Sequence, residues 1–141
     1  MIGKLKGVID EILEDHILID VGGVGYLVNC TNSLISSLII GNQESFHIQM
    51  VVREDNIILY GFRFLEEKKW FNLLQTVQGV GSKMALSILS NLDIAKIQAA
   101  IIANDVSTFK AVSGIGPKLA SRIVNELKGK KEIFTTFSDH F

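Results

Sequence analysis

The sequence has a single cysteine, Cys30, among its 141 residues, and this scarcity excludes an internal disulfide framework. It also has no apolar run of the roughly 18 residues that a membrane-spanning helix needs. The first residues, MIGKLKGVIDEIL, carry acids where a signal peptide has an uninterrupted apolar stretch. Hydrophobic residues make up 48% of the chain, which is enough for a packed core. These features predict a soluble cytoplasmic protein of one or two small domains.

The sequence also lacks the residue patterns of catalytic and cofactor sites. His16, His47 and His140 are scattered and have no partnering cysteine, so we expect no metal site. GVGSK lacks the spacer and the Lys-Ser/Thr of a P-loop, and no GxGxxG follows an expected strand, so we expect no ATP site. No spaced pair of catalytic residues is visible. We therefore expect neither a cofactor nor an enzyme activity.

Charge is divided unevenly along the chain. The formal net charge is −1. Residues 1–62 hold three basic and eight acidic residues, a net charge of −5, whereas residues 63–131 hold eleven basic and five acidic residues, a net charge of +6. A phosphate-binding surface is therefore expected in the second half of the chain.

Residues 1–63 have the pattern of a small β domain. Five short runs rich in Ile, Val, Leu and aromatic residues alternate with turn-forming residues such as Gly22-Gly23 and Gly41-Asn42. The expected strands are 2–8, 16–21, 25–30, 45–52 and 57–62, with one short capped helical turn at 31–38. Five strands of this length suit a closed barrel of the OB type, although another five-stranded barrel or a meander fits nearly as well. Cys30 ends the third strand and is expected in the core.

Residues 64–130 have the pattern of an all-α domain, so the whole chain belongs to the α+β class. The expected helices are 64–76, 82–90, 94–103, 106–112 and 117–127. Asp93 and Asp105 are expected as N-caps, and Pro117 opens the last helix. Trp70 and Phe71 are expected in the core rather than stacked on bases. Residues 131–141 are expected to form a flexible linker or tail.

The second half contains an internal repeat with an offset of 35 residues. VQGVGSKMA at 77–85, the first hairpin, aligns with VSGIGPKLA at 112–120, the second hairpin. Each copy is a helix, then an apolar-Gly-apolar-Gly turn, then another helix. Val80 and Ile115 are expected to anchor the two turns in the core, and Ala85 and Ala120 to let the helices pack closely. Such a register is hard to reach by chance.

This arrangement predicts two anion sites. Glycines permit a tight turn with φ > 0, and the absence of a Cβ lets another backbone approach closely, above all at Gly81 and Gly116. The helix that follows presents its unpaired N–H groups at the same place. Lys83 and Lys118 add a positive charge beside the anion. The alternative is that each GxG only joins two helices and each lysine is solvated, but two copies in register, each with a lysine, favour the anion sites.

Glu54 and Asp55 follow Arg53 at an expected hairpin turn between the last two strands. From the residues alone, a solvated turn is the favoured interpretation. The alternative is an acidic projection that repels DNA and so helps to direct its strands.

Taken together, five sequence motifs resemble the RuvA family over essentially the whole chain. They are MIGKLKG at the start, VGGVGY at 21–26, VVRED at 51–55, LYGF at 59–62, and both hairpins. The resemblance implies an OB barrel followed by a tandem helix-hairpin-helix domain. It also implies a homotetramer with fourfold symmetry, or two such tetramers on one DNA, that holds a four-way Holliday junction open in a square-planar form.

The same resemblance implies roles for individual residues. The backbone-binding positions of the family correspond here to Gly79, Gly81, Ser82, Lys83, Gly114, Gly116, Lys118 and Arg122. The acidic pin at the centre of the tetramer corresponds to Glu54 and Asp55, which turns the interpretation of these two acids from a solvated turn to a projection that parts the strands. The implied partners are the motor ATPase RuvB and the resolvase RuvC.

Two questions remain open at this stage. Members of the family usually carry a third, small helical domain after a flexible linker, and that domain contacts RuvB; the sequence ends at Phe141, where that linker would begin. The resemblance therefore predicts junction binding in recombination and repair and leaves the recruitment of RuvB open. The alternative functions are a general duplex-binding module without junction preference and a helix-hairpin-helix repair enzyme.

Overall fold

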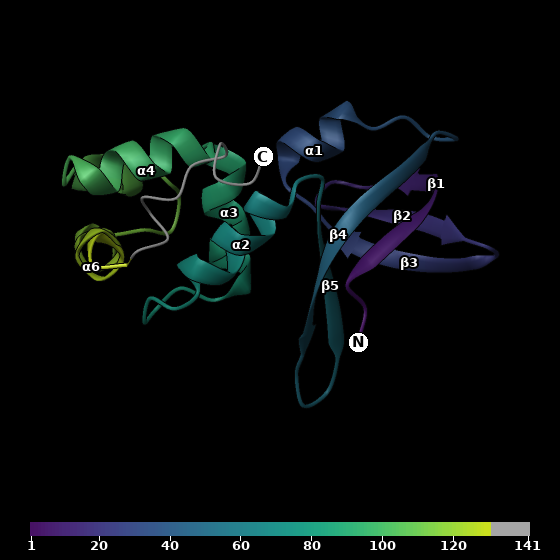
Figure 1. Cartoon of the computed structure of the whole chain (residues 1–141), viewed down its shortest axis with the longest axis horizontal. Helices are drawn as coiled ribbons and strands as arrows, with labels where there is room; N and C mark the ends of the chain where they lie inside the picture. The colour runs from purple at the N-terminus through teal and green to yellow at the C-terminus, as the bar shows by residue number, and fades with distance from the viewer. Residues whose placement is uncertain (131–141) are drawn as a thin grey trace. The chain divides into compact units, whose positions relative to one another are not determined.

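The computed structural model describes residues 1–130, which fall into two compact units. The first unit is Met1–Lys68 and the second begins at Lys69 (Figure 1). The linker predicted at 131–141 lies outside the described residues. In those that are described, no single helix is long and apolar enough to cross a membrane. One pair of helices, Ser82–Asn91 and Ile94–Ile102, passes that test jointly by length and composition, with a bend of 98° between them.

The first unit is a closed five-stranded barrel, which confirms the predicted fold class. Its strands are β1 (Lys4–Ile12), β2 (His16–Val21), β3 (Val24–Asn29), β4 (Gln43–Val52) and β5 (Ile57–Phe62). Neighbouring strands pair in the order β1-β2-β3-β5-β4, and β4 pairs with β1 to close the barrel. The β3–β5 pair is parallel and the others are antiparallel. Apolar side chains that alternate along the strands fill the interior.

The predicted end of the first strand at residue 8 was wrong. The strand β1 continues to Ile12, which pairs with Ile17. Its register with β2 shifts between Ile9 and Glu11, so the strand carries a bulge at this point. The bulge interrupts the alternation of apolar and polar residues at two consecutive acids, Asp10 and Glu11.

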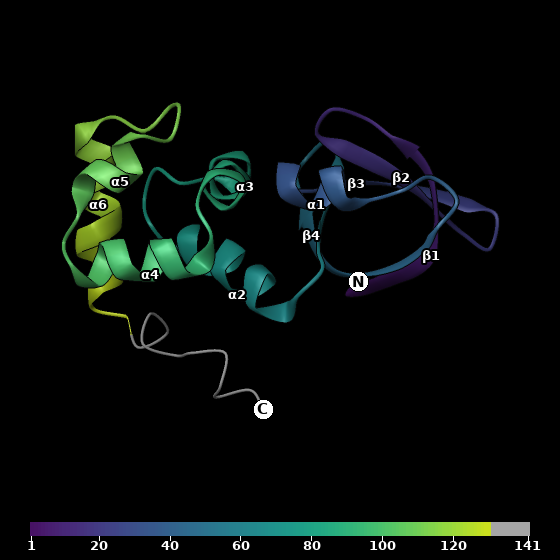
Figure 2. The ribbon, with the colours of Figure 1, turned by 90° about the horizontal axis from the view of Figure 1, so that it is seen from above.

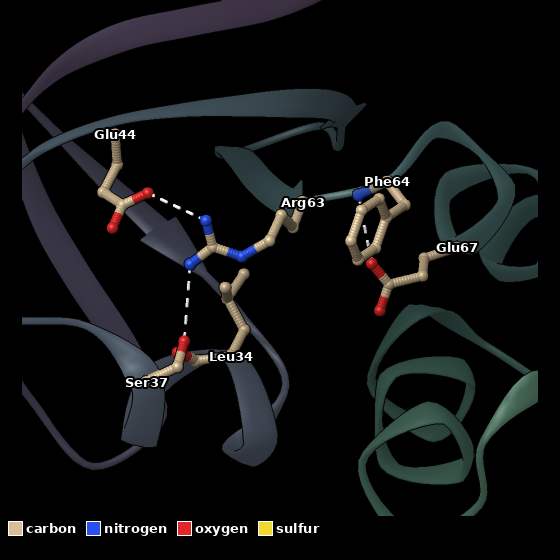
Figure 3. Close-up of polar contacts among 6 residues, drawn as sticks. All are labelled: Leu34, Ser37, Glu44, Arg63, Phe64 and Glu67. Atoms are coloured by element: carbon tan, nitrogen blue, oxygen red, sulfur yellow. Dashed lines mark hydrogen bonds and ion pairs between the residues drawn. The ribbon is translucent and has the colours of Figure 1, made fainter.

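A short helix, α1 (Asn32–Ser37), connects β3 to β4 where a capped helical turn was predicted. The hydroxyl of Thr31 accepts a hydrogen bond from the Leu34 N–H at 3.3 Å and caps the helix. Arg63, just after β5, donates to Glu44 Oε1 at 2.9 Å and to Ser37 Oγ at 3.4 Å (Figure 3). This half-buried guanidinium joins the end of β5 to β4 and α1.

Residues interpreted as core are buried in both units. Cys30 is 2% exposed, and burial raises the pKa of its thiol to about 12. Trp70 and Phe71 are 5% and 0% exposed, so they are not a surface on which bases could stack. Near the end of the first unit, burial raises the pKa of Glu67, whose carboxylate accepts from the Phe64 N–H at 3.1 Å (Figure 3). This contact caps the helix that follows.

The second unit is made of helices close to the predicted ones. They are α2 (Leu65–Leu74), which begins within the first unit, α3 (Ser82–Asn91), α4 (Ile94–Ile102), α5 (Val106–Lys110) and α6 (Pro117–Lys128). Asp93 and Asp105 cap α4 and α5 as predicted, because their carboxylates accept from Lys96 N and Thr108 N. Helices α4, α5 and α6 pack against one another (Figure 2).

The close packing of β1 against β2 predicts that one added methyl group at Gly7 destabilises the barrel. A Cβ at the buried Gly7 would lie 2.3 Å from the backbone oxygen of Asp20, which the β1–β2 pairing holds in place. We therefore expect Gly7→Ala to lower the free energy of unfolding by about 1–3 kcal/mol, as overpacking does. Gly3→Ala is the control, because nothing lies within 4 Å of its added Cβ. Thermal melts of the two variants check this, and equal melting temperatures would contradict the close approach.

Candidate nucleic-acid interface

The two hairpins have nearly the same backbone geometry. In the first hairpin the Val80 N–H donates to the Val77 carbonyl at 3.0 Å, and in the second the Ile115 N–H donates to the Val112 carbonyl at 3.1 Å. Val80 and Ile115 are buried, as predicted for anchors. The next helices then begin in the same way, with Ala85 N to Gly81 O at 2.9 Å and Ala120 N to Gly116 O at 3.0 Å. The repeat in the sequence is therefore a repeat in structure.

The left-handed backbone lies at the first glycine of each turn. Gly79 and Gly114 have φ values of +98° and +89°. The expectation that the hairpin glycines adopt φ > 0 is thus met only at the first glycine of each turn: Gly81 and Gly116 have φ values of −92° and −85°, with extended ψ. They are N-caps, a position where the backbone is extended. A Cβ at either would meet nothing within 4 Å, so the second glycines leave open space in front of the helices.

The N-termini of α3 and α6 differ from those of their neighbours. Asp93 and Asp105 place a carboxylate on the first turns of α4 and α5, which satisfies an N–H group and would repel an anion. The caps of α3 and α6 are glycines that make no side-chain hydrogen bond. Within the described residues, the N–H groups of Lys83 and Lys118 therefore have no acceptor. Free N–H groups at the positive end of a helix dipole are a favourable place for an anion.

The predicted side chains gather around these two N-termini. Lys83 and Lys118 are exposed in the first turns of α3 and α6, which contain no acidic residue. A cation in a first turn is unfavourable for an isolated helix, so both lysines run against the local electrostatic preference. Ser82 is 6% exposed and its hydroxyl donates to Gln75 Oε1 at 2.8 Å. Its hydroxyl is thus engaged inside the domain.

Contacts between the two repeats are the part of the site that sequence reasoning missed. A Cβ at Gly79 would lie 3.1 Å from Leu119 Cδ1, and a Cβ at Gly114 would lie 3.4 Å from Met84 Cε. Met84 and Leu119 are equivalent residues of the 35-residue repeat, so each turn is covered by the matching side chain of the other copy. Arg122, which was predicted to bind DNA, donates from Nη1 to the Gln78 carbonyl at 3.1 Å. The repeat in the sequence makes Met84 and Leu119 equivalent, but it gives no signal for the contact of Arg122 with Gln78.

Glu54 and Asp55 occupy the tip of the β4–β5 hairpin. The turn is closed by the Arg53 N–H, which donates to the Asn56 carbonyl at 2.8 Å, and both acids are exposed. The flanking pair Val52 and Ile57 is also exposed, at 63% each. Figure 1 shows the hairpin extending as a two-stranded arm. The two acids therefore project on an arm rather than lying against the barrel.

The fold and the site define a class: a small closed barrel of the OB type joined to a tandem of helix-hairpin-helix motifs. The described residues hold no group of three His, Cys, Asp or Glu side chains that could bind a metal ion. Residues 1–61 match the RuvA N terminal domain, and residues 71–130 match the SAM-like helix-hairpin-helix tandem. In these two domains the chain belongs to the RuvA family.

Individual relatives agree with this assignment. The chain is 54% identical over 130 residues to the Holliday junction branch migration complex subunit RuvA of Rickettsia typhi, and 55% identical to that of Rickettsia prowazekii. It is 52% identical over 136 residues to the protein of the same name from Chelativorans sp.. The Rickettsia matches cover 92% of this chain and the Chelativorans match 95%. The chain spans about two thirds of the length of these relatives, 65% for the first two and 66% for the third.

The turn geometry predicts opposite outcomes for the two glycines of one hairpin. Gly79→Ala should lower the free energy of unfolding by about 1–2 kcal/mol, because φ is positive and Leu119 crowds the added methyl group. Gly81→Ala, two residues away, should change it by less than about 0.5 kcal/mol, since its φ is negative and its surroundings are open. Urea titrations of both variants measure the difference. A Gly79→Ala variant as stable as Gly81→Ala would contradict the left-handed turn.

Proposed function

We propose that this chain binds the sugar-phosphate backbone of DNA at the N-termini of α3 and α6, without preference for base sequence. The observation that carries the proposal is a contrast among four helices of one domain. Helices α4 and α5 have an aspartate as N-cap, whereas α3 and α6, which follow the hairpins, have a glycine as N-cap and a lysine in the first turn. Two phosphates of a backbone would accept from the free N–H groups. Because phosphates carry no sequence information, affinity should not depend on sequence.

The exposed groups of each site fit this role. Gly81 and Gly116 leave the space in front of the helix open, and Lys83 and Lys118 add charge beside it. Gly79 and Gly114 shape the turns that aim the helix ends. The hydroxyl of Ser82 is not required, because it already donates to Gln75. The backbone N–H groups and the two lysines are therefore the proposed phosphate ligands.

The proposed substrate is a four-way Holliday junction, held by a homotetramer or by two tetramers. The relatives named as branch migration complex subunits support this extension, together with the exposed acids on the β4–β5 arm. Four copies around one axis would place Glu54 and Asp55 of each arm near the crossover, where carboxylates repel phosphates. The chain would then act as a non-catalytic scaffold in recombination and repair. RuvB, which would supply the ATPase, and RuvC are its proposed partners.

One experiment tests the substrate directly. A gel-shift comparison measures the dissociation constants for a four-way junction and for a linear duplex of equal length, at one salt concentration. Native mass spectrometry of the free protein and of the complex gives the number of subunits. We expect tighter binding to the junction by a tetramer or an octamer. Equal affinities for the two DNAs would leave a general duplex-binding module and exclude the junction function.

Lys83 predicts the salt dependence of binding. The logarithm of the affinity falls with the logarithm of the salt concentration by about 0.9 per neutralised phosphate on duplex DNA. Lys83→Ala should make that slope shallower by about one unit per protomer in contact and weaken binding alike on all sequences. Titrations with one duplex at four salt concentrations measure the slope.

The control for this prediction is Lys96→Ala. Lys96 is also exposed in the first turn of a helix of the same domain, but that helix is capped by Asp93. Its removal should leave the slope unchanged. If the Lys83 and Lys96 variants behave alike, the proposed phosphate site at α3 is wrong.

If the acidic arm repels continuous duplex, neutralising its two acids should change the preference for junction over duplex DNA and not only the affinity. Glu54→Gln combined with Asp55→Asn removes the repulsion and nearly preserves shape. Binding to linear duplex should rise while junction binding holds or tightens, so the ratio of duplex to junction dissociation constants should fall. The melting temperature should stay within a few degrees, because an exposed turn contributes little to the core. An unchanged ratio would make the two acids an ordinary solvated turn.

A further inference from the structure

Arg122 makes a contact that joins the two hairpins. Its Nη1 atom donates to the backbone carbonyl of Gln78, 44 residues earlier in the chain, at 3.1 Å. The same atom would lie 3.5 Å from a Cβ at Gly79, so the guanidinium lies directly against the left-handed turn of the first hairpin. Glu126, one turn further along α6, approaches the Nε atom at 3.8 Å. A side chain of the second repeat therefore holds the backbone of the first.

The equivalent positions of the other repeat do not make the same contact. The position equivalent to Arg122 in the first repeat is Ser87, and the position equivalent to Gln78 is Ser113. A serine side chain is too short to span the same distance, and among the described residues the Ser87 hydroxyl makes no hydrogen bond to the second hairpin. Both turns have an apolar cover, Leu119 over the first and Met84 over the second. The first hairpin has in addition the charged donor Arg122, which the second lacks.

The geometry gives this hydrogen bond a definite consequence. The carbonyl of Gln78 and the N–H of Gly79 belong to one planar peptide unit, so holding the carbonyl restrains the rotation that leads into the turn. A hydrogen bond from a guanidinium is stronger than one between neutral groups. When the first turn is held in this conformation, the chain continues directly to Gly81 and to the free N–H groups of α3.

We propose that Arg122 is a positioning residue, which fixes the anion site of the first hairpin relative to the site of the second. It acts on DNA through the backbone of Gln78, not as a phosphate ligand of its own. The two sites would then bind two phosphates at a set spacing, as one rigid clamp. The consequence for DNA rests on the proposed function, whereas the coupling of the two hairpins does not.

The competing role makes an opposite prediction. Arg122 lies four residues after Lys118 on α6, and residues at this spacing are neighbours on a helix surface. An arginine that bound a phosphate beside Lys118 would be coupled to Lys118 and not to Lys83. A positioning arginine would instead be coupled to Lys83, because both act at the first hairpin.

Two double-mutant cycles distinguish the roles. Arg122→Met keeps a long apolar stem and removes the donors. It is combined with Lys83→Ala in one cycle and with Lys118→Ala in the other, and affinities for one duplex are measured at one salt concentration. We expect the loss caused by Lys83→Ala to be at least about threefold smaller in the Arg122→Met background. The loss of affinity caused by Lys118→Ala should be the same with and without Arg122→Met to within about twofold, the usual error for independent sites. Coupling to Lys118 without coupling to Lys83, or no coupling to either, would overturn the proposal.

A measurement without DNA tests the same coupling. The Val80 N–H closes the first turn and the Ile115 N–H closes the second, so their hydrogen-exchange rates report on the two turns separately. In Arg122→Met, Val80 should exchange several-fold faster and Ile115 should not change. Ser87→Ala, the matched control, should change neither rate. An unchanged rate at Val80 would overturn the proposal, and so would equal acceleration at both amides, which indicates general loosening of the domain.

The two kinds of failure are separable. If the wild-type protein shows no salt-dependent binding to DNA, the proposed function fails, and the exchange rates still decide whether Arg122 holds the first hairpin. If DNA binds but Arg122 couples to Lys118 alone, the proposed function survives and Arg122 is a phosphate ligand.

Discussion

The geometry of the two hairpins depends on two left-handed glycines, each covered by the other repeat. Gly79 and Gly114 turn the chain with positive φ, and Leu119 and Met84 fill the space beside them. A side chain at either glycine would meet both a conformational penalty and a steric one. Because the cover of each turn comes from the other copy, neither hairpin can form its native surroundings alone. The two helix N-termini are consequently parts of one packed domain.

Electrostatics then separates these two N-termini from the others in the domain. An aspartate at the start of a helix satisfies an N–H group and opposes the helix dipole, which stabilises α4 and α5. The glycine N-caps of α3 and α6 accept no hydrogen bond, and the lysines in the first turns add positive charge at the positive end of the dipole. These two helices therefore lack the stabilisation that an aspartate cap gives. The same local rule is broken at two equivalent positions, which supports the proposed phosphate sites. The buried Ser82 hydroxyl is satisfied within the domain by Gln75.

The barrel follows a different physical rule, the alternation of side chains along a strand. In the β4–β5 pairing, the pairs on one face run from Ile48 and Gly61 to Met50 and Leu59, and then to Val52 and Ile57. The first of these residues are buried, and the last pair is 63% exposed. The apolar face of the hairpin thus continues past the barrel interior and ends at the acidic turn. Pairing of the two backbones, rather than the core, supports the tip of this arm.

The sequence by itself determined the elements and most of their boundaries. Alternation with a period of two identified the strands, and turn residues, capping aspartates and the 35-residue repeat identified the helices and hairpins. These signals are local, so they can be read without knowing what packs against what. The boundary of β1 was misplaced for the same reason, because a bulge breaks the local period.

Tertiary structure alone decided which glycine is left-handed and what Arg122 contacts. Gly79 and Gly81 are both glycine in a GxG pattern, and the sequence does not distinguish the residue that turns the chain from the residue that caps the helix. The Arg122–Gln78 hydrogen bond and the Arg63–Glu44 ion pair join residues 44 and 19 positions apart. Such contacts depend on how elements pack in three dimensions, and no period or spacing in the sequence encodes that packing.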